Sequence, residues 1–380
     1  MLTYLHAIVI GAVLFQVSAT AQAPARVRAM QELAEPPVPS DPLELVTGNA
    51  QPVQEVSQRA EIITMLENAH KHSNIRAQPY DLKTTFTVTG SLSAGVWQME
   101  DTSPGAELYR WTAQGPSYSA VNLTANHIFY SNQPASGLPL RLVQAREAIF
   151  YAKPFVGPRA TLRTATASLN GADLVCALIA HNAMSPAGTG GRLWEEEEYC
   201  VDSKAGTLVS YSPAPGSYIV YDYSKAVTFH GKLIPNAFTI SQAGQTIIEA
   251  QTESVADPAN NPAAFQPAGL NQIGVGAVMS GAWRSRMRLP LPGGPQATAA
   301  QTTTAPVVVM HGMQAPNGQV SDLEMLASSD PSLNESALTF ATQWQGGLLG
   351  QQPDTGATPQ SHEFVMQIQY FNMQRLVSQQ

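Results

Sequence analysis

The chain has 380 residues, of which 44% are apolar and 13% are charged, so it is long enough for two globular domains plus flexible ends. Its net charge of -8 argues against nucleic-acid binding, because phosphates are neutralised by clustered lysine and arginine. Outside the N-terminus no stretch of about 20 apolar residues occurs, so we expect no interior transmembrane helix.

The first 21 residues have the pattern of a secretory signal peptide. Leu5–Phe15 is an apolar core, and Ala19-x-Ala21 fits a signal-peptidase site. The alternative is an uncleaved membrane anchor, although the apolar run is short for a bilayer. Either way the body is exported, and we expect a periplasmic protein that is membrane-tethered only if the segment stays attached. Residues 22–52 are rich in Pro, Ala and acidic residues and predict a disordered leader.

A helix is predicted over Val53–Ser73, at the start of a main domain that we place at residues 53–268. His70 and His72 are two residues apart and do not share a helical face, so they indicate cations at a helix C-terminus and not a metal site. The apolar stripe of this helix would be Val53, Val56, Ala60, Ile63 and Leu66.

From Tyr80 the hydrophobic period changes to two, which is typical of antiparallel strands. Turns such as Asn170-Gly171 separate them, and one more helix is predicted over Leu138–Phe150. The predicted strands are 82–88, 95–100, 108–112, 117–123, 127–131, 161–169, 174–181, 193–201, 207–212, 218–229, 233–242 and 245–255. A sheet of on the order of ten strands is expected to curl or close.

The two cysteines, Cys176 and Cys200, predict one disulfide, because the chain is exported and has an even number of them. Neither lies in a Cys-x-x-Cys motif, and a metal site would need two further ligands, so we expect no metal.

The densest charge run is Glu195–Glu198. Strand alternation puts Glu195 and Glu197 on one face and Glu196 and Glu198 on the other. We expect a solvated strand whose charges Arg192 and Lys204 balance. The alternative is a paired-carboxylate or Ca²⁺ site. The common hydrolase, zinc-protease, P-loop and Rossmann motifs do not occur, so we expect neither an enzyme nor a cofactor.

Part of the middle resembles a known family. The matching residues are Tyr199-Cys200-Val201-Asp202-x3-Gly206-x-Leu208, Tyr221-x-Tyr223 and Gly231-x-Leu233-Ile234-Pro235. Over about 79–255 the pattern is similar to the curved half-barrel of LolA-type lipoprotein carriers. The resemblance implies a concave apolar face that wraps around a helix and can hold an acyl chain. The ligand-facing candidates are then Phe86, Trp97, Trp111, Phe129, Tyr221 and Phe238. The alternative is that they are ordinary core residues.

Residues 269–305 are irregular, end in an Ala/Thr-rich run and predict a linker to a second domain, 306–373. In that domain we expect strands at 307–310 and 320–326, a helix that Asp330 caps and Pro331 begins, and a last strand over Glu363–Phe371.

The same region resembles the C-terminal domain of TonB. The matching residues are Gly318-x-Val320, Leu326-x-Ser328-Ser329, Leu333-x3-Ala337-Leu338 and Trp344. The resemblance implies a docking domain that binds another protein by strand addition. The candidate partner-binding strand carries Phe364, Met366, Ile368 and Tyr370.

The predicted fold class is therefore α+β, with a large curved antiparallel sheet followed by a small TonB-like domain. The function we expect is that of a non-enzymatic cell-envelope protein that binds an envelope protein partner and serves envelope transport. The alternative is a periplasmic lipid or lipoprotein carrier that uses the concave sheet. A hydrolase with an unrecognised site has only the glutamate run in its favour. The sequence does not predict the oligomeric state.

Overall fold

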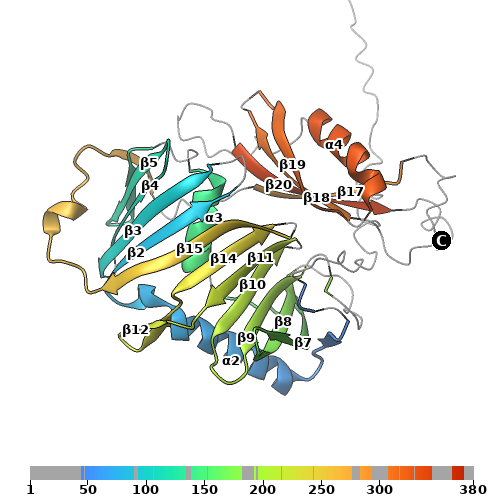
Figure 1. Ribbon diagram of the computed structural model, residues 1–380, viewed down its shortest axis with the longest axis horizontal. Helices are drawn as coiled ribbons and strands as arrows, with labels where there is room; N and C mark the ends of the chain where they lie inside the picture. Colours follow the sequence, from blue (N-terminus) through green and yellow to red (C-terminus); the bar gives the residue numbers. More distant parts are fainter. Residues whose placement is uncertain are drawn as a thin grey trace, which may run out of the picture. The chain divides into compact units, whose positions relative to one another are not determined.

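The computed structural model describes residues 44–371 except 47, 90–92, 106, 134–137, 152, 182–191, 194–195, 215, 243, 276–282, 293–306, 316, 329 and 345–361. The predicted signal peptide, residues 1–21, and the first part of the predicted leader lie outside this part of the chain. Among the described residues the strands form a sheet of 14 strands, a ribbon of two and a sheet of four (Figure 1). No helix in the described part combines the length and apolar character that crossing a bilayer requires.

The large sheet is open and curved, and every neighbouring pair of its strands is antiparallel. In spatial order its strands are β1 (Gln51–Pro52), β7 (Thr161–Leu169), β8 (Ala172–Ala180), β9 (Glu197–Asp202), β10 (Leu208–Ala214), β11 (Ser217–Asp222), β14 (Ala237–Gln242), β15 (Gln245–Ala256), β2 (Tyr80–Val88), β3 (Gly95–Gly105), β4 (Leu108–Gln114), β5 (Ser119–Ala125), β6 (Ile128–Ser131) and β16 (Asn271–Val275). The pairing of β15 with β2 joins two runs of consecutive strands into one sheet.

Local sequence explains these strands. Along β2, alternate residues from Tyr80 to Val88 are buried, as the period of two predicts. Between β7 and β8, Asn170 and Gly171 both have positive φ, 52° and 82°, which a two-residue hairpin turn requires. The predicted strand 218–229 is interrupted, since β11 ends at Asp222 and a separate two-stranded ribbon, β12 (Val227–Phe229) and β13 (Lys232–Ile234), follows.

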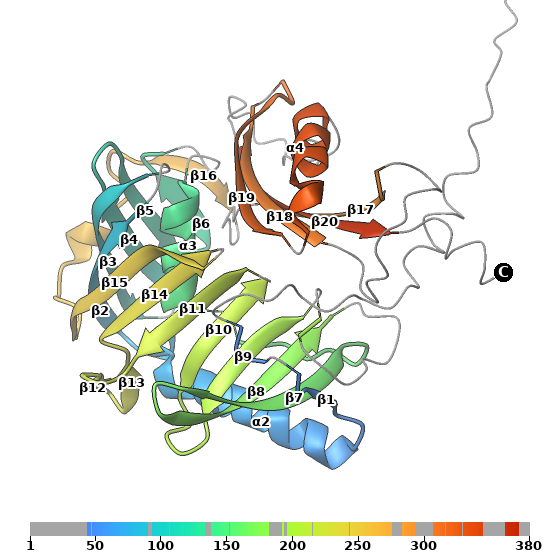
Figure 2. The same cartoon turned by 45° about the vertical axis from the view of Figure 1, so that its right-hand side comes forward.

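Two helices, α2 (Val56–Ser73) and α3 (Leu140–Ile149), pack on the same face of the large sheet and share its main apolar core. Figure 2 shows α3 inside the curve of the sheet. We call the face of the large sheet that carries both helices the curved face. The predicted stripe of α2 is wrong in register, because the helix buries Ile62, Leu66 and Ala69 while Val56 is 82% exposed. Polar contacts of Arg59 hold the first turns of the helix instead.

The opposite face of the sheet is covered by residues that were predicted to be disordered. Alternate residues of β8 face opposite ways, so Ala177 and Ile179 join the main core while Cys176 and Leu178 join a second apolar cluster. Segment 44–52 lies on this second cluster, where Val46 is fully buried and Gln51 pairs with Thr164 of β7. We call residues 44–52 the strap. The described part of the leader therefore packs on the sheet, because its apolar side chains cover this cluster.

The four-stranded sheet has its own apolar cluster. In spatial order its strands are β17 (Trp283–Pro290), β20 (His362–Phe371), β18 (Val307–Gln314) and β19 (Val320–Ser328), and helix α4 (Asn334–Gln343) packs on them after the short helix η4 (Pro331–Leu333). The predicted order of two strands, a helix and a strand is confirmed, and the Asp330 carboxylate caps the helix by accepting from the Ser332 N–H at 3.0 Å.

The range predicted as a linker, 269–305, contains two strands. Its first strand, β16, pairs with β6 of the large sheet, and its second, β17, runs parallel to β20. Local sequence could not indicate how β17 pairs, because its partner β20 lies about eighty residues further along the chain. The boundaries of the two predicted domains remain predictions.

Candidate functional site

Five of the six predicted ligand-facing residues lie together on the curved face. Phe86, Trp97, Trp111, Tyr221 and Phe238 belong to the main core, and each is at most 6% exposed. The Phe86 and Trp97 rings stack with centroids 5.8 Å apart, and the Tyr221 and Phe238 rings are 6.3 Å apart. The sixth, Phe129 on β6, is half-buried and lies outside this cluster. The five clustered residues pack in the apolar core, which α2 and α3 complete. This burial is what the alternative predicts, namely that they are ordinary core residues.

Further tyrosines extend this aromatic surface, and the sequence analysis did not single them out. Tyr199 on β9 stacks on Tyr211 of β10 at 4.6 Å, and Tyr151, after α3, lies 6.2 Å from Tyr221. The Tyr221 hydroxyl donates to the Ala148 carbonyl of α3 at 2.7 Å, which ties the sheet to the helix. Burial raises the pKa of Tyr151 to about 12, so this hydroxyl is neutral at pH 7. Tyr199 and Tyr211 lie in the predicted strands 193–201 and 207–212. Their place in the alternation of those strands was the signal that could have identified them.

Helix α3 is fastened to the sheet by a buried ion pair. Arg146 Nη1 donates to both carboxylate oxygens of Asp101 on β3 at 3.1 Å, and the two side chains are at most 1% exposed. Arg146 Nη2 donates to the Tyr109 hydroxyl, which donates to Asp101 in turn. The guanidinium also lies 4.0 Å above the Trp111 ring. Burial is the largest single influence and disfavours the charged guanidinium, but Asp101, Tyr109 and Tyr80 together outweigh burial and raise the pKa of Arg146.

Helix α2 is attached differently, mainly by polar contacts at its edge. Only three of its 18 residues are buried. Residues 151–160 run beside it, as three contacts show: the Ser73 hydroxyl lies 3.3 Å from the Tyr151 hydroxyl, Lys153 Nζ lies 2.6 Å from Glu67 Oε1, and Arg59 Nη2 donates to the Gly157 carbonyl at 2.9 Å. These groups are partly exposed, so each contact contributes little stability.

On the opposite face, Glu196 and Glu198 are buried and Glu196 is ion-paired, so the prediction of a solvated strand is wrong for these two residues. Arg163 on β7 donates from Nε and Nη2 to the two oxygens of Glu196, each at 2.7 Å, and both side chains are fully buried. Arg192 is also buried and donates to the Glu196 carbonyl at 2.6 Å, while Lys204 stays exposed beside Asp173. Glu196 is buried because the strap covers this face. Glu195 lies outside the described residues.

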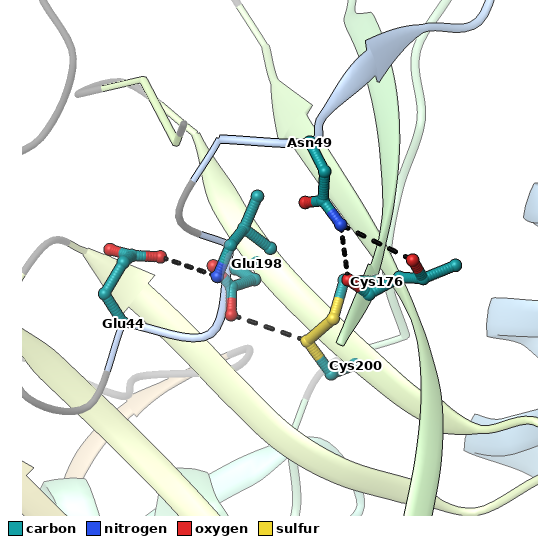
Figure 3. Close-up of a disulfide and its surroundings, with 7 residues drawn as sticks. Glu44, Asn49, Cys176, Glu198 and Cys200 are labelled. Atoms are coloured by element: carbon teal, nitrogen blue, oxygen red, sulfur yellow. Dashed lines mark hydrogen bonds between the residues drawn. A yellow bond between two sulfur atoms is a disulfide. The ribbon is translucent and has the colours of Figure 1, made fainter. Parts of the chain in front are cut away.

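The predicted disulfide between Cys176 and Cys200 is confirmed, and it joins residues directly opposite each other on β8 and β9 (Figure 3). Glu198 Oε1 lies 3.4 Å from the Cys200 sulfur. The two sulfurs and the Glu198 carboxylate lie within 4.8 Å of one another, but a disulfide offers no thiolate to a metal.

Glu198 shares its buried surroundings with Glu44 of the strap. Glu44 accepts from the Tyr218 hydroxyl at 2.8 Å. Burial raises the pKa of Glu198 to about 8, against the attraction of Arg192 and with the repulsion of Glu44. Two arginines, Arg163 and Arg192, and three glutamates meet here, so the charges balance when Glu198 is protonated. The cluster therefore stabilises the strap, and no substrate-facing acid–base pair results.

The predicted partner-binding strand of the four-stranded sheet is not available for strand addition. β20 lies between β17 and β18, so both of its edges are paired. Its candidate side chains, Phe364, Met366, Ile368 and Tyr370, are fully buried in the cluster under α4. This assignment is corrected because β17, which was expected to be linker, occupies the second edge. The outer strands of this sheet are β17 and β19.

Comparison with known proteins gives a weak structural likeness. No protein-family model matches the chain, and no curated protein matches it in sequence. A LolA superfamily protein from Nitrosomonas europaea is similar to 53% of this chain over 96% of its own length, at 10% identity and a TM-score of 0.36. A putative outer membrane lipoprotein-sorting protein domain from Vibrio parahaemolyticus is similar to 55% of this chain over 98% of its own length, at 7% identity and the same TM-score of 0.36.

Proposed function

We propose that this chain is a non-enzymatic periplasmic carrier of lipid or lipoprotein, which holds acyl chains against the curved face of its large sheet. The observation that carries the proposal is the contrast between the two helices on that face. α3 is fastened by the buried Arg146–Asp101 pair, whereas α2 packs beside β9 in the same apolar core through three buried side chains and partly exposed polar contacts. α2 is thus the element that an acyl chain would displace.

The estimated free energies favour the displacement of α2 by an acyl chain. Uncovering Ile62 and Leu66 of α2 costs roughly 3–6 kcal/mol, at about 1.5–3 kcal/mol per large side chain. An acyl chain of about 16 carbons gains on the order of 10 kcal/mol, at about 0.8 kcal/mol per buried methylene. The aromatic rings of the curved face would accept the chain without directional bonds, and the Tyr221 hydroxyl already has its partner in the Ala148 carbonyl of α3.

A fluorescent fatty acid tests the proposal. The wild-type protein is expected to bind the probe and to raise its fluorescence as the chain leaves water. Leu66→Ala weakens the docking of α2, so it should bind the probe faster and more tightly. Val56→Ala changes an exposed apolar residue of the same helix and should behave as the wild type does. Failure of both the wild type and Leu66→Ala to bind the probe would refute the carrier function.

The four-stranded sheet supports a second candidate function, the docking of an envelope protein. Its outer strand β19 exposes Asp322 and Glu324, which suits the addition of an extended, basic peptide segment. Asp322 has φ 52° at an irregularity in the β18–β19 register, so the addition would use the second half of the strand. A photo-crosslinking residue at Glu324 should trap one defined partner in cells. A crosslinker at exposed Glu249 on β15 is the control, and equal trapping at both positions would count against docking.

A further inference from the structure

Cations from two distant segments meet at the C-terminal end of α2. The last turn of the helix carries His70, Lys71 and His72, and Arg76 follows in the short helix η1 (Ile75–Ala77). Lys232, on the β12–β13 ribbon, donates from Nζ to the Lys71 carbonyl at 2.7 Å. Residues 161 positions apart are thereby held together on the surface. This contact places the ribbon beside the end of α2.

Arg76 is oriented by aromatic rings and not by an acid. Its guanidinium carbon lies 4.3 Å from the centroid of the Phe150 ring and 5.7 Å from that of Tyr109. Among the described residues, no side chain or carbonyl accepts a hydrogen bond from this guanidinium, and the residue is exposed. A guanidinium that lies over aromatic rings, with its N–H groups free, can bind two oxygens of a phosphate.

The positive charge at this end of α2 is not balanced locally. Burial lowers the pKa of His70, and the charges of Lys153, Arg76 and Lys232 lower it further. Lys153 is paired with Glu67, and on the ribbon His230 is paired with Asp257 at 2.7 Å. Within the described residues Arg76 and Lys232 have no carboxylate ion-pair partner, and Lys71 has only the charge of Glu67, which already pairs with Lys153. The whole chain has a net charge of -8, so this surface differs in sign from the average of the protein.

The β12–β13 ribbon also carries an exposed apolar side chain. Val227 on β12 is 41% exposed and belongs to the same ribbon as Lys232. Cations next to an exposed apolar residue are the composition that binds the interface of a bilayer, where phosphates lie above acyl chains. An acidic protein would use the cations but would not need Val227. We call Lys71, Arg76, Lys232 and Val227 the basic surface.

We propose that the basic surface docks this protein onto membranes that contain anionic phospholipid. Arg76 binds a lipid phosphate with its free N–H edge, Lys71 and Lys232 neutralise neighbouring headgroups, and Val227 enters the interface. Each basic residue near an anionic bilayer strengthens binding roughly fivefold, so the docking is weak and reversible. The docking goes beyond the carrier function and does not depend on it, although it would bring the end of α2 to the membrane.

Sedimentation with lipid vesicles tests the docking. The purified protein is expected to sediment with vesicles of phosphatidylcholine and phosphatidylglycerol, but not with vesicles of phosphatidylcholine alone. Because the attraction is electrostatic, it should be lost when salt is raised from about 0.1 M to about 1 M, which shortens the Debye length from about 10 Å to about 3 Å. Equal sedimentation with both kinds of vesicle would overturn the proposal.

Two double variants with the same net charge locate the surface. Lys71→Ala/Arg76→Ala should lower the partition onto anionic vesicles on the order of 20-fold. Lys83→Ala/Lys204→Ala removes two exposed cations from β2 and from the β9–β10 turn, and it should bind as the wild type does. Equal losses in the two variants would refute the proposal, because net charge alone would then explain the binding.

Two further measurements separate the possible causes of a failure. If the loss of Arg76 disturbs the packing of Phe150, the single variant Lys71→Glu still tests the membrane docking, because it changes only an exposed position. Retention on an immobilised acidic peptide without binding to anionic vesicles would overturn membrane docking and assign the surface to an acidic protein. If the protein binds the fluorescent fatty acid normally but does not sediment with vesicles, the docking proposal fails and the carrier function stands.

Discussion

Arg146 on α3 and Asp101 on β3 form an ion pair beneath the helix, and neither side chain is more than 1% exposed. Asp101→Asn leaves the buried guanidinium without a counter-charge, so we expect it to lower the free energy of unfolding by about 3–5 kcal/mol. The matched double variant Arg146→Met/Asp101→Leu removes both charges and should regain most of that loss. Urea unfolding measures the free energy of unfolding of the wild type and of the two variants. A loss below about 1 kcal/mol in Asp101→Asn would contradict the role of this pair.

The disulfide should stabilise the fold through the chain that it closes. Cys176 and Cys200 are 24 residues apart, and a loop of that length contributes about 3 kcal/mol on the chain-entropy model. We expect Cys176→Ser/Cys200→Ser to lose about this much stability in urea unfolding. Reduction of the wild type should have the same effect once the buried sulfurs are exposed. A double variant as stable as the wild type would show that β8–β9 pairing needs no cross-link.

The stability contribution of Glu198 should depend on pH in a defined direction. Burial, with the repulsion of Glu44, raises the folded-state pKa of Glu198 to about 8, above its ordinary value of 4.5. The native state therefore binds the proton more tightly than the unfolded state, so this contribution is complete below pH 4.5 and is lost as the pH rises towards 8. Glu198→Gln keeps a neutral side chain of the same shape and should remove this slope.

Urea midpoints at several pH values between about 5 and 9 measure the effect. The exposed Glu249→Gln on β15 removes the same charge and serves as the control, with a pH profile like that of the wild type. If Glu198→Gln keeps the full wild-type slope, the proton is not held at this position.

Helix α2 should open more often than the strands that it covers. Few side chains of α2 are buried, whereas β2 is hydrogen-bonded to a strand on both sides, to β15 and to β3. We expect the amide hydrogens of α2 to exchange faster than those of β2, and Leu66→Ala to accelerate exchange in α2 without changing β2. Hydrogen exchange read by mass spectrometry resolves the two segments. Equal protection of α2 and β2 would exclude α2 as the displaceable element.

Local sequence predicted the elements whose determinants are local. Alternation in residues 82–88 gave β2, Asn170-Gly171 gave the β7–β8 turn, and Asp330 with Pro331 gave the start of the short helix η4 that precedes α4. The cysteine count gave the disulfide. Each of these depends on residues within a few positions or on a simple count, so the pattern sufficed.

Sequence patterns failed where distant residues decide the outcome. Glu196 is buried because Arg163 pairs with it and the strap covers both, and nothing near Glu196 in the sequence indicates that cover. Strand β20 is central and not an edge because β17 pairs with it from about eighty residues away. Five of the six aromatic candidates lie in one cluster on the curved face and Phe129 does not, and their role in binding stays a prediction. Alternation could not say that α2 and α3 would cover them.

Native mass spectrometry of the purified protein tests the carrier function most directly. The account predicts a mass increased by one acylated ligand, the loss of that ligand on solvent extraction, and its return when phosphatidylglycerol is added to the refolded chain. The mass of the chain alone, before and after incubation with lipid, would contradict it.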